Sequence, residues 1–140
     1  MADINDWNKK IIEEFRANAG VVGGQFAGAP MVLITTTGAK SGQQRTAPLV
    51  CYPEAERLVI FASKAGAPTN PDWYHNLVAN PELTVEYGAE KYSATASELH
   101  GAERNEIFAK QVERMPGFGE YAAKTEGIRT IPVVALTRNA

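Results

Sequence analysis

The sequence contains few of the residues that disulfide frameworks and most metal centres need. Its 140 residues include one cysteine, Cys51, and two histidines, His75 and His100. One cysteine cannot form an internal disulfide, and the histidines stand apart from it and from any carboxylates at metal-ligand spacing. We therefore expect no structural disulfide and no metal centre, with Cys51 as a small residue of the core.

Long apolar runs and a secretory leader are also missing. No apolar run approaches the roughly 18 residues of a membrane-spanning helix. Residues 1–18 lack the basic stretch and the following apolar stretch of a signal peptide. These absences predict a cytoplasmic protein with no stable insertion into a membrane.

Acidic residues are scarce in one part of the chain. The formal net charge is -2 overall, but residues 31–71 contain more cations than acids: Lys40, Arg45, Arg57 and Lys64 against Glu54 and Glu56. A locally basic region in a mildly acidic protein favours a small anionic ligand. It does not provide the extended basic surface that nucleic acid requires, so we expect no nucleic-acid partner.

The basic region contains a predicted β-hairpin with a polar tip. A strand-like run over 31–37 breaks at Gly38, and the strand pattern resumes after Arg45. Between them lie Lys40, Ser41 and Gly42. Glycine permits turns that direct backbone N–H groups inward, while lysine and arginine supply positive charge. The tip therefore predicts a phosphate or carboxylate site, although a solvated hairpin tip can have the same composition.

A second segment suited to a ligand follows the third predicted strand. Residues 63–68 are mostly small and would let the backbone approach something flat: Ser63, Lys64, Ala65, Gly66, Ala67 and Pro68. Asn70 is the expected N-cap of a helix over 72–79, with Pro71 at its first position.

The remaining pattern predicts one mainly β domain with peripheral helices, an α+β fold, over residues 1–140. Most strand-like runs are joined by short turns, which favours an antiparallel sheet closed into a barrel; they cover 31–37, 46–52, 57–63, 83–87, 90–99 and 129–137. Pro132 should restrict the last strand to an edge or a bulge. Amphipathic patterns predict further helices over 4–18, 102–115 and 118–125, the first a candidate lid.

No residue pattern indicates catalysis by the side chains alone. Ser41 and Ser63 lack the Gly-x-Ser-x-Gly elbow of a hydrolase, and Glu82 and Glu86 have the spacing of a solvated strand face. Anion-binding loops without an acid, base or nucleophile suit an enzyme whose bound cofactor carries the chemistry.

Three motifs in sequence order resemble the deazaflavin-dependent nitroreductase family. They are residues 35–42 with Arg45, residues 62–77, and residues 129–134. The resemblance covers nearly all of the chain from about residue 31 to residue 137. It implies a split β-barrel of about six antiparallel strands that binds coenzyme F420, a deazaflavin with a phosphate and an oligoglutamate tail. Hydride from the reduced coenzyme would pass to a small activated acceptor such as a quinone, a nitroaromatic or an unsaturated lactone.

The resemblance also implies roles for individual residues. The phosphate and the tail would lie at Lys40, Ser41, Gly42 and Arg45, and the deazaflavin ring along residues 63–68. Asn70, Trp73 and Asn76 would complete or support that loop, and Tyr121 would donate a proton to the acceptor. Ala39 and Thr69 stand where family members often carry basic residues, so we expect a weaker hold on the tail.

Two alternatives stay open at this point. The first is an FMN-dependent oxidoreductase on the same barrel, because a phosphate-binding hairpin does not distinguish one phosphate from a longer acidic tail. The second is a carrier that binds the deazaflavin or a lipid without turnover. The sequence is equally compatible with a monomer and a homodimer.

Overall fold

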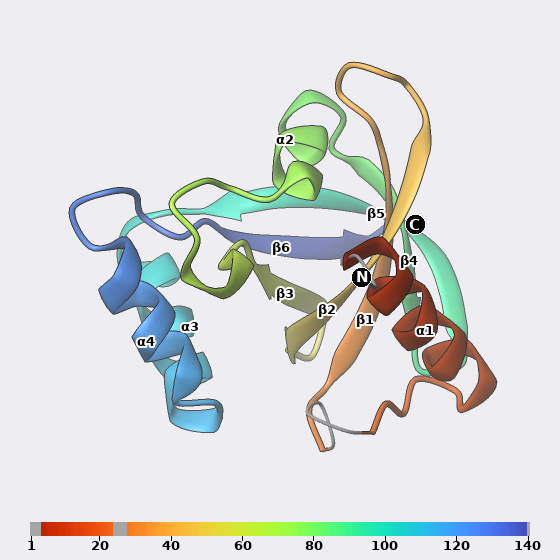
Figure 1. Ribbon diagram of the computed structural model, residues 1–140, viewed down its shortest axis with the longest axis horizontal. Coiled ribbons are helices and arrows are strands. Elements are labelled where there is room, and N and C mark those ends of the chain that lie inside the picture. Colours follow the sequence, from red (N-terminus) through yellow and green to blue (C-terminus); the bar gives the residue numbers. More distant parts are fainter. Residues whose placement is uncertain (1–3, 24–27, 140) are drawn as a thin grey trace.

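Six strands form a closed antiparallel barrel in the computed structural model, which describes residues 4–23 and 28–139 (Figure 1). The strands are β1 (Met31–Thr37), β2 (Gln44–Pro53), β3 (Arg57–Phe61), β4 (Glu82–Tyr87), β5 (Glu90–Leu99) and β6 (Val133–Arg138). Their order around the barrel is β1-β2-β3-β6-β5-β4, and β4 pairs back with β1 to close it. The predicted antiparallel barrel is confirmed.

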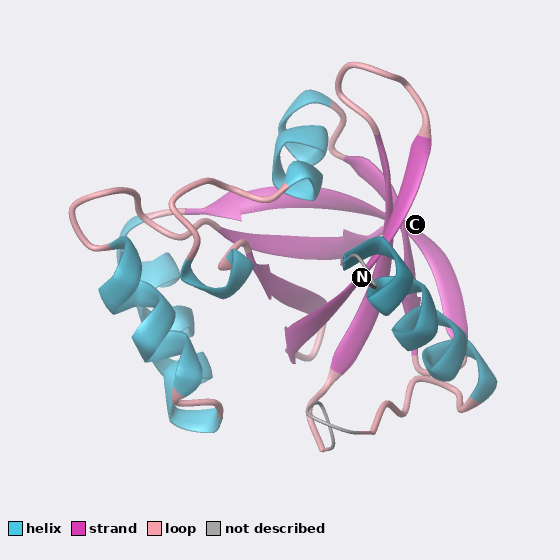
Figure 2. Cartoon of the chain, viewed as in Figure 1, coloured by secondary structure: helices cyan, strands magenta, loops and turns pink. Residues whose placement is uncertain are grey.

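Helices surround the barrel (Figure 2). Those in the described residues are α1 (Ile4–Ala17), α2 (Asp72–Ala79), α3 (Gly101–Arg114), α4 (Gly117–Thr125) and a short 3-10 helix, η2 (Lys64–Gly66). Each predicted helix is present with ends within one residue of the expected ones. None of the described helices combines the length and apolar character needed to cross a membrane.

Helix α1 lies against the barrel on the side opposite α3 and α4 (Figure 1). Its buried Ile11 and Phe15 pack on β1. Arg16 donates two hydrogen bonds, of 3.0 and 2.8 Å, to the Glu86 carboxylate of β4. This bidentate ion pair lowers the pKa of Glu86 from its ordinary value.

The core has two main parts because β3 buries both of its faces. Leu58 and Ile60 belong to the barrel interior, whereas Val59 and Phe61 pack with α3 and α4. This alternation follows from the two-residue period of a strand. Cys51 is fully buried in the barrel interior, and desolvation raises its pKa to about 12, which agrees with its expected core role.

The structure corrects the ends of several predicted strands, and β2 begins at Gln44, not Thr46. β3 ends at Phe61, not Ser63, and β6 begins at Val133, not Arg129. Pro132 has no N–H group for a strand ladder, and it lies just before β6 rather than inside it. β6 therefore pairs with both β3 and β5, and the predicted edge position is wrong.

The predicted cap of α2 is also wrong. Pro71 occupies the N-cap position, and no side chain caps the helix. Asn70 instead accepts a hydrogen bond of 2.7 Å from Arg129 at its Oδ1 atom. A charged guanidinium donor takes the place of the local backbone N–H that the capping prediction assumed.

Asn76 connects α2 to the β1–β2 hairpin. Its side chain is only 8% exposed. Asn76 Nδ2 donates to Thr36 Oγ1 at 3.1 Å, and the Ala39 N–H donates to Asn76 Oδ1 at 3.0 Å. One amide side chain therefore fixes the base of the hairpin tip to the helix.

We expect Asn76→Ala to lower the free energy of unfolding by about 1 to 3 kcal/mol, because Thr36 and Ala39 both lose this partner. Urea denaturation measures the change. Val78→Ala, on the exposed side of the same helix, is the control and should alter stability by less than about 0.5 kcal/mol. Equal stability of the two variants would contradict the role given to Asn76.

Candidate functional site

The loop between β3 and α2 has a constrained backbone. Lys64 has a φ of 47°, in the left-handed region that residues other than glycine rarely adopt, and Gly66 has a φ of 82°. A left-handed conformation at a non-glycine residue costs about 1 to 3 kcal/mol. Other contacts must hold this loop, residues 62–70, in place.

Arg129 supplies those contacts. Its guanidinium donates to the Ala62 carbonyl oxygen at 3.0 Å, the Ser63 carbonyl oxygen at 2.9 Å and the Ala67 carbonyl oxygen at 3.0 Å. A fourth bond goes to Asn70 Oδ1. Arg129 belongs to the third sequence motif, but no role in the site was predicted for it. The sequence signal for such a role was an arginine near the last predicted strand, with no acidic residue close to it in the chain except Glu126.

Several amides of the loop, including the neighbouring pair of Ser63 and Lys64, are left for a ligand in the described residues. The Gly66 and Ala67 N–H groups donate within the turn, to the carbonyl oxygens of Ser63 at 2.9 Å and Lys64 at 3.0 Å. In the described part of the chain, the N–H groups of Ser63 and Lys64 have no acceptor. Neighbouring free N–H groups on a fixed backbone form a donor pair for an oxygen or nitrogen of a ligand.

Helix α4 covers the η2 turn at Gly66. A Cβ atom on Gly66 would lie 2.8 Å from Lys124 Cδ and 3.4 Å from Tyr121 Cα, so a larger residue would require the Lys124 side chain to shift, besides the strain of the positive φ. The Tyr121 ring is half-buried and contacts Phe118 edge to face, with 5.3 Å between centroids. The structure thus brings the Tyr121 backbone close to the loop at Gly66, and its role as proton donor stays a prediction. Lys124, which the sequence analysis missed, lies there too.

The hairpin tip is exposed and carries unpaired cations. Its turn is closed by a hydrogen bond from the Gly38 N–H to the Gln43 carbonyl oxygen, at 2.8 Å. The Gln43 N–H donates to Ser41 Oγ at 3.2 Å, which leaves the Ser41 hydroxyl proton free to donate. Among the described residues, Lys40 and Arg45 have no acidic partner. The same holds for Lys64.

Helix α2 links the tip to the loop. The loop runs directly into α2 at Pro71, and Asn76 of α2 holds Ala39 of the tip. Figure 1 shows α2 next to the protruding end of the β1–β2 hairpin, with the η2 segment extending from it toward α4. Trp73 is buried against the barrel interior. The predicted support of the 62–70 loop by Trp73 and Asn76 stays a prediction.

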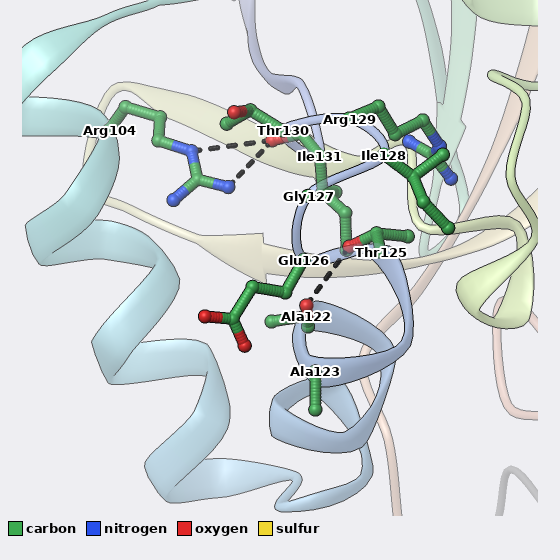
Figure 3. Close-up of a pocket in the computed structure, with 10 residues that line it drawn as sticks. All are labelled: Arg104, Ala122, Ala123, Thr125, Glu126, Gly127, Ile128, Arg129, Thr130 and Ile131. Atoms are coloured by element: carbon green, nitrogen blue, oxygen red, sulfur yellow. Dashed lines mark hydrogen bonds between the residues drawn. The ribbon is translucent and has the colours of Figure 1, made fainter.

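A separate cleft of about 570 Å³ lies on the other face of α4 (Figure 3). Arg104 of α3, the C-terminal half of α4 and residues 126–131 line it. Arg104 donates to the Ile131 carbonyl oxygen at 2.8 and 3.3 Å. Arg129 lines this cleft and also donates hydrogen bonds to the 62–70 loop. None of the predicted site residues lines the cleft.

The chemistry available at the tip and the loop is binding and orientation. Cations and free N–H groups can hold an anionic or electron-rich ligand, and Tyr121 can donate a proton. Within the described residues, no three His, Cys, Asp or Glu side chains are grouped to hold a metal ion. Lysine, arginine, serine and tyrosine side chains do not transfer hydride, so a redox step at the tip and the loop would use a bound cofactor.

Comparison with known proteins identifies that group. Residues 7–138 match the model of the F420H(2)-dependent quinone reductase family. The F420H(2)-dependent quinone reductase Rv1261c of Mycobacterium tuberculosis (strain ATCC 25618 / H37Rv) is 35% identical over 128 residues, which are 89% of this chain and 85% of that protein.

Solved structures agree with the family. An F420-H2 dependent reductase, FDR-A, is 44% identical with a TM-score of 0.69, over 76% of this chain and 93% of that one. A structure described as a domain-swapped dimer is 38% identical with a TM-score of 0.71, over 96% of this chain and 99% of that one. A Listeria innocua protein described as a candidate pyridoxamine 5'-phosphate oxidase, 9% identical with a TM-score of 0.55, shares the fold alone and supports the split barrel.

These findings confirm the predicted family resemblance, the predicted reductase function and coenzyme F420 as the cofactor. The individual site residues stay predictions. The chain belongs to the F420H(2)-dependent quinone reductase family and is an F420H2-dependent reductase on a six-stranded split barrel.

Proposed function

We propose that this chain reduces a quinone with hydride from reduced coenzyme F420 bound between the hairpin tip and the 62–70 loop. The observation that carries this proposal is the Arg129-held loop, whose neighbouring Ser63 and Lys64 N–H groups are free and lie on the segment that Tyr121 flanks. The quinone is the acceptor named for the family and for the Mycobacterium tuberculosis relative.

The residues of the tip fit the acidic end of the coenzyme. Lys40 and Arg45 would bind the phosphate and the glutamate tail as charge-assisted donors, with the Ser41 hydroxyl and the Gly42 backbone beside them. Both cations are exposed, and no acid within the described residues competes for them. Thr69 already accepts a hydrogen bond of 3.2 Å from Lys64 Nζ. Because Thr69 is uncharged and its hydroxyl oxygen already has a partner, we expect part of the tail to stay in solvent.

The loop fits the ring system. The Ser63 and Lys64 N–H groups would donate to the polar edge of the deazaflavin, and the small backbone of 65–68 would lie along the ring. Asn70, Trp73 and Asn76 would support this segment from behind. When bound, the coenzyme supplies the hydride. The protein positions the ring, and the packing of α4 on Gly66 limits the space beside it.

Tyr121 is the proposed proton donor to the acceptor. Its hydroxyl has no hydrogen-bond partner in the described part of the chain, and its ring is held against Phe118. A fixed phenol with a free O–H can supply the proton that a carbonyl oxygen of the acceptor takes up when hydride is transferred.

Helix α1 as a lid is likewise a proposal. A homodimer is another, which the domain-swapped relative supports.

Lys40→Ala and Arg45→Ala should each weaken binding of coenzyme F420 by about 1 to 3 kcal/mol, because each removes a charge-assisted hydrogen bond. Added salt should weaken wild-type binding as well. Calorimetric titration measures both effects. Lys91→Ala, a cation on β5 outside the site, is the matched control. Unchanged affinity in both tip variants would remove the tip from the site.

Tyr121→Phe should lower the turnover rate about a hundredfold while leaving coenzyme affinity almost unchanged, because it removes the proton donor and keeps the ring. Steady-state assays with a quinone and a nitroaromatic compound measure the rate. Tyr92→Phe, a half-buried tyrosine beneath Arg138, is the control. A wild-type rate for Tyr121→Phe would mean that water or the coenzyme supplies the proton.

Coenzyme F420 should bind more tightly than FMN at matched ionic strength, because Lys40, Arg45 and Lys64 offer more charge than one phosphate needs. Shortening the glutamate tail should weaken binding only modestly, since the cations are exposed. Tighter binding of FMN in a calorimetric titration would favour the flavin alternative. Binding of F420 without hydride transfer to any acceptor would indicate a carrier.

A further inference from the structure

The Arg129 side chain has no carboxylate among its hydrogen-bond partners in the described residues. Its hydrogen-bond acceptors in the described residues are three backbone carbonyl oxygens and one amide oxygen. Partial burial lowers its pKa from the ordinary value, but an arginine side chain stays charged at neutral pH. A positive charge is therefore fixed directly behind the 62–70 loop, with only peptide dipoles to balance it.

Two of these carbonyls belong to the peptide units that carry the free N–H groups. The Ala62 carbonyl is joined to the Ser63 N–H, and the Ser63 carbonyl to the Lys64 N–H. A charged donor at a carbonyl oxygen polarises its peptide unit and strengthens the N–H at the other end. The Ala67 carbonyl is followed by Pro68, which has no N–H, so that bond only holds the loop.

We propose that Arg129 is a positioning residue that makes the site prefer the reduced over the oxidised deazaflavin, by holding the loop and strengthening the Ser63 and Lys64 N–H donors. This inference rests on the proposed function, which places the polar edge of the ring on this loop. Reduction adds a hydride, so the reduced ring carries one more negative charge unless its polar edge also takes up a proton, and N–H donors or positive charge at that edge stabilise this charge. No covalent bond forms or breaks in this step.

Arg104 offers a matched control in the same region. Like Arg129, it is partly buried and donates to a backbone carbonyl, that of Ile131, and it also lies over the Phe108 ring at 4.6 Å. Figure 3 shows Arg104 reaching residues 126–131 from α3, while Arg129 points away on the other side. None of its hydrogen bonds in the described structure goes to the 62–70 loop.

The experiment compares affinities for the oxidised and the reduced coenzyme in the wild type, Arg129→Gln and Arg104→Gln. Anaerobic fluorescence titration gives both dissociation constants. Arg129→Gln should lose about tenfold more affinity for the reduced form than for the oxidised form. For a two-electron couple this lowers the midpoint potential of the bound coenzyme by about 30 mV. Arg104→Gln should keep the wild-type ratio of the two constants.

A second measurement, amide hydrogen exchange, uses the protein without coenzyme. Amide hydrogen exchange of the free protein should show faster exchange over residues 64–69 in Arg129→Gln and wild-type exchange there in Arg104→Gln. Unchanged exchange over this segment would overturn the holding role of Arg129. A merely structural role would change the exchange but leave the ratio of the two affinities unaltered.

Other outcomes have definite meanings. Equal loss of both affinities in Arg129→Gln overturns the preference for the reduced form. If that variant does not fold, Arg129→Lys replaces it, because lysine keeps the charge but cannot make all four bonds. The ratio of the affinity for the reduced form to that for the oxidised form should then fall partway. An unchanged ratio overturns the inference. If the wild type and Arg104→Gln bind neither form, the proposed placement of the coenzyme has failed, and with it the inference.

Discussion

The hydrogen bonds between Arg129 and the 62–70 loop are the constraint on which the rest of the candidate site depends. The loop contains a left-handed lysine, Lys64, whose backbone is unfavourable by itself. Hydrogen bonds to a charged group contribute about 1.5 to 3 kcal/mol each, so four of them can offset that cost. The same bonds fix the direction of the Ser63 and Lys64 N–H groups and the entry of the chain into α2.

The barrel brings the separate parts of the site together. β1 and β2 carry the hairpin tip, β3 leads into the loop, and the segment before β6 carries Arg129. β3 and β6 are neighbours, and this places Pro132 beside Ala62: the Ala62 N–H donates to the Pro132 carbonyl oxygen at 2.9 Å. Asn76 then fixes the tip to α2. Sheet register, rather than local sequence, sets these distances.

Helix α4 separates two regions with different properties. On one side, Gly66 allows the η2 turn to approach Tyr121 and Lys124 closely, because there is no room for a Cβ atom. On the other side lies the open cleft with Arg104 and residues 126–131. Arg129 belongs to both, since it lines the cleft and its side chain holds the loop.

The barrel and its helices could be predicted from the sequence alone, because strand alternation, helical periodicity and hairpin turns are local signals. The motifs also identified the family. Only the tertiary structure decided the partner of Asn70, the start of β6 after Pro132, and the contact of Lys124 with Gly66. It also decided the role of Arg129, whose hydrogen-bond partners lie 59 to 67 residues earlier in the chain. Barrel closure sets such pairings, and no local pattern encodes which carbonyl groups a distant guanidinium will meet.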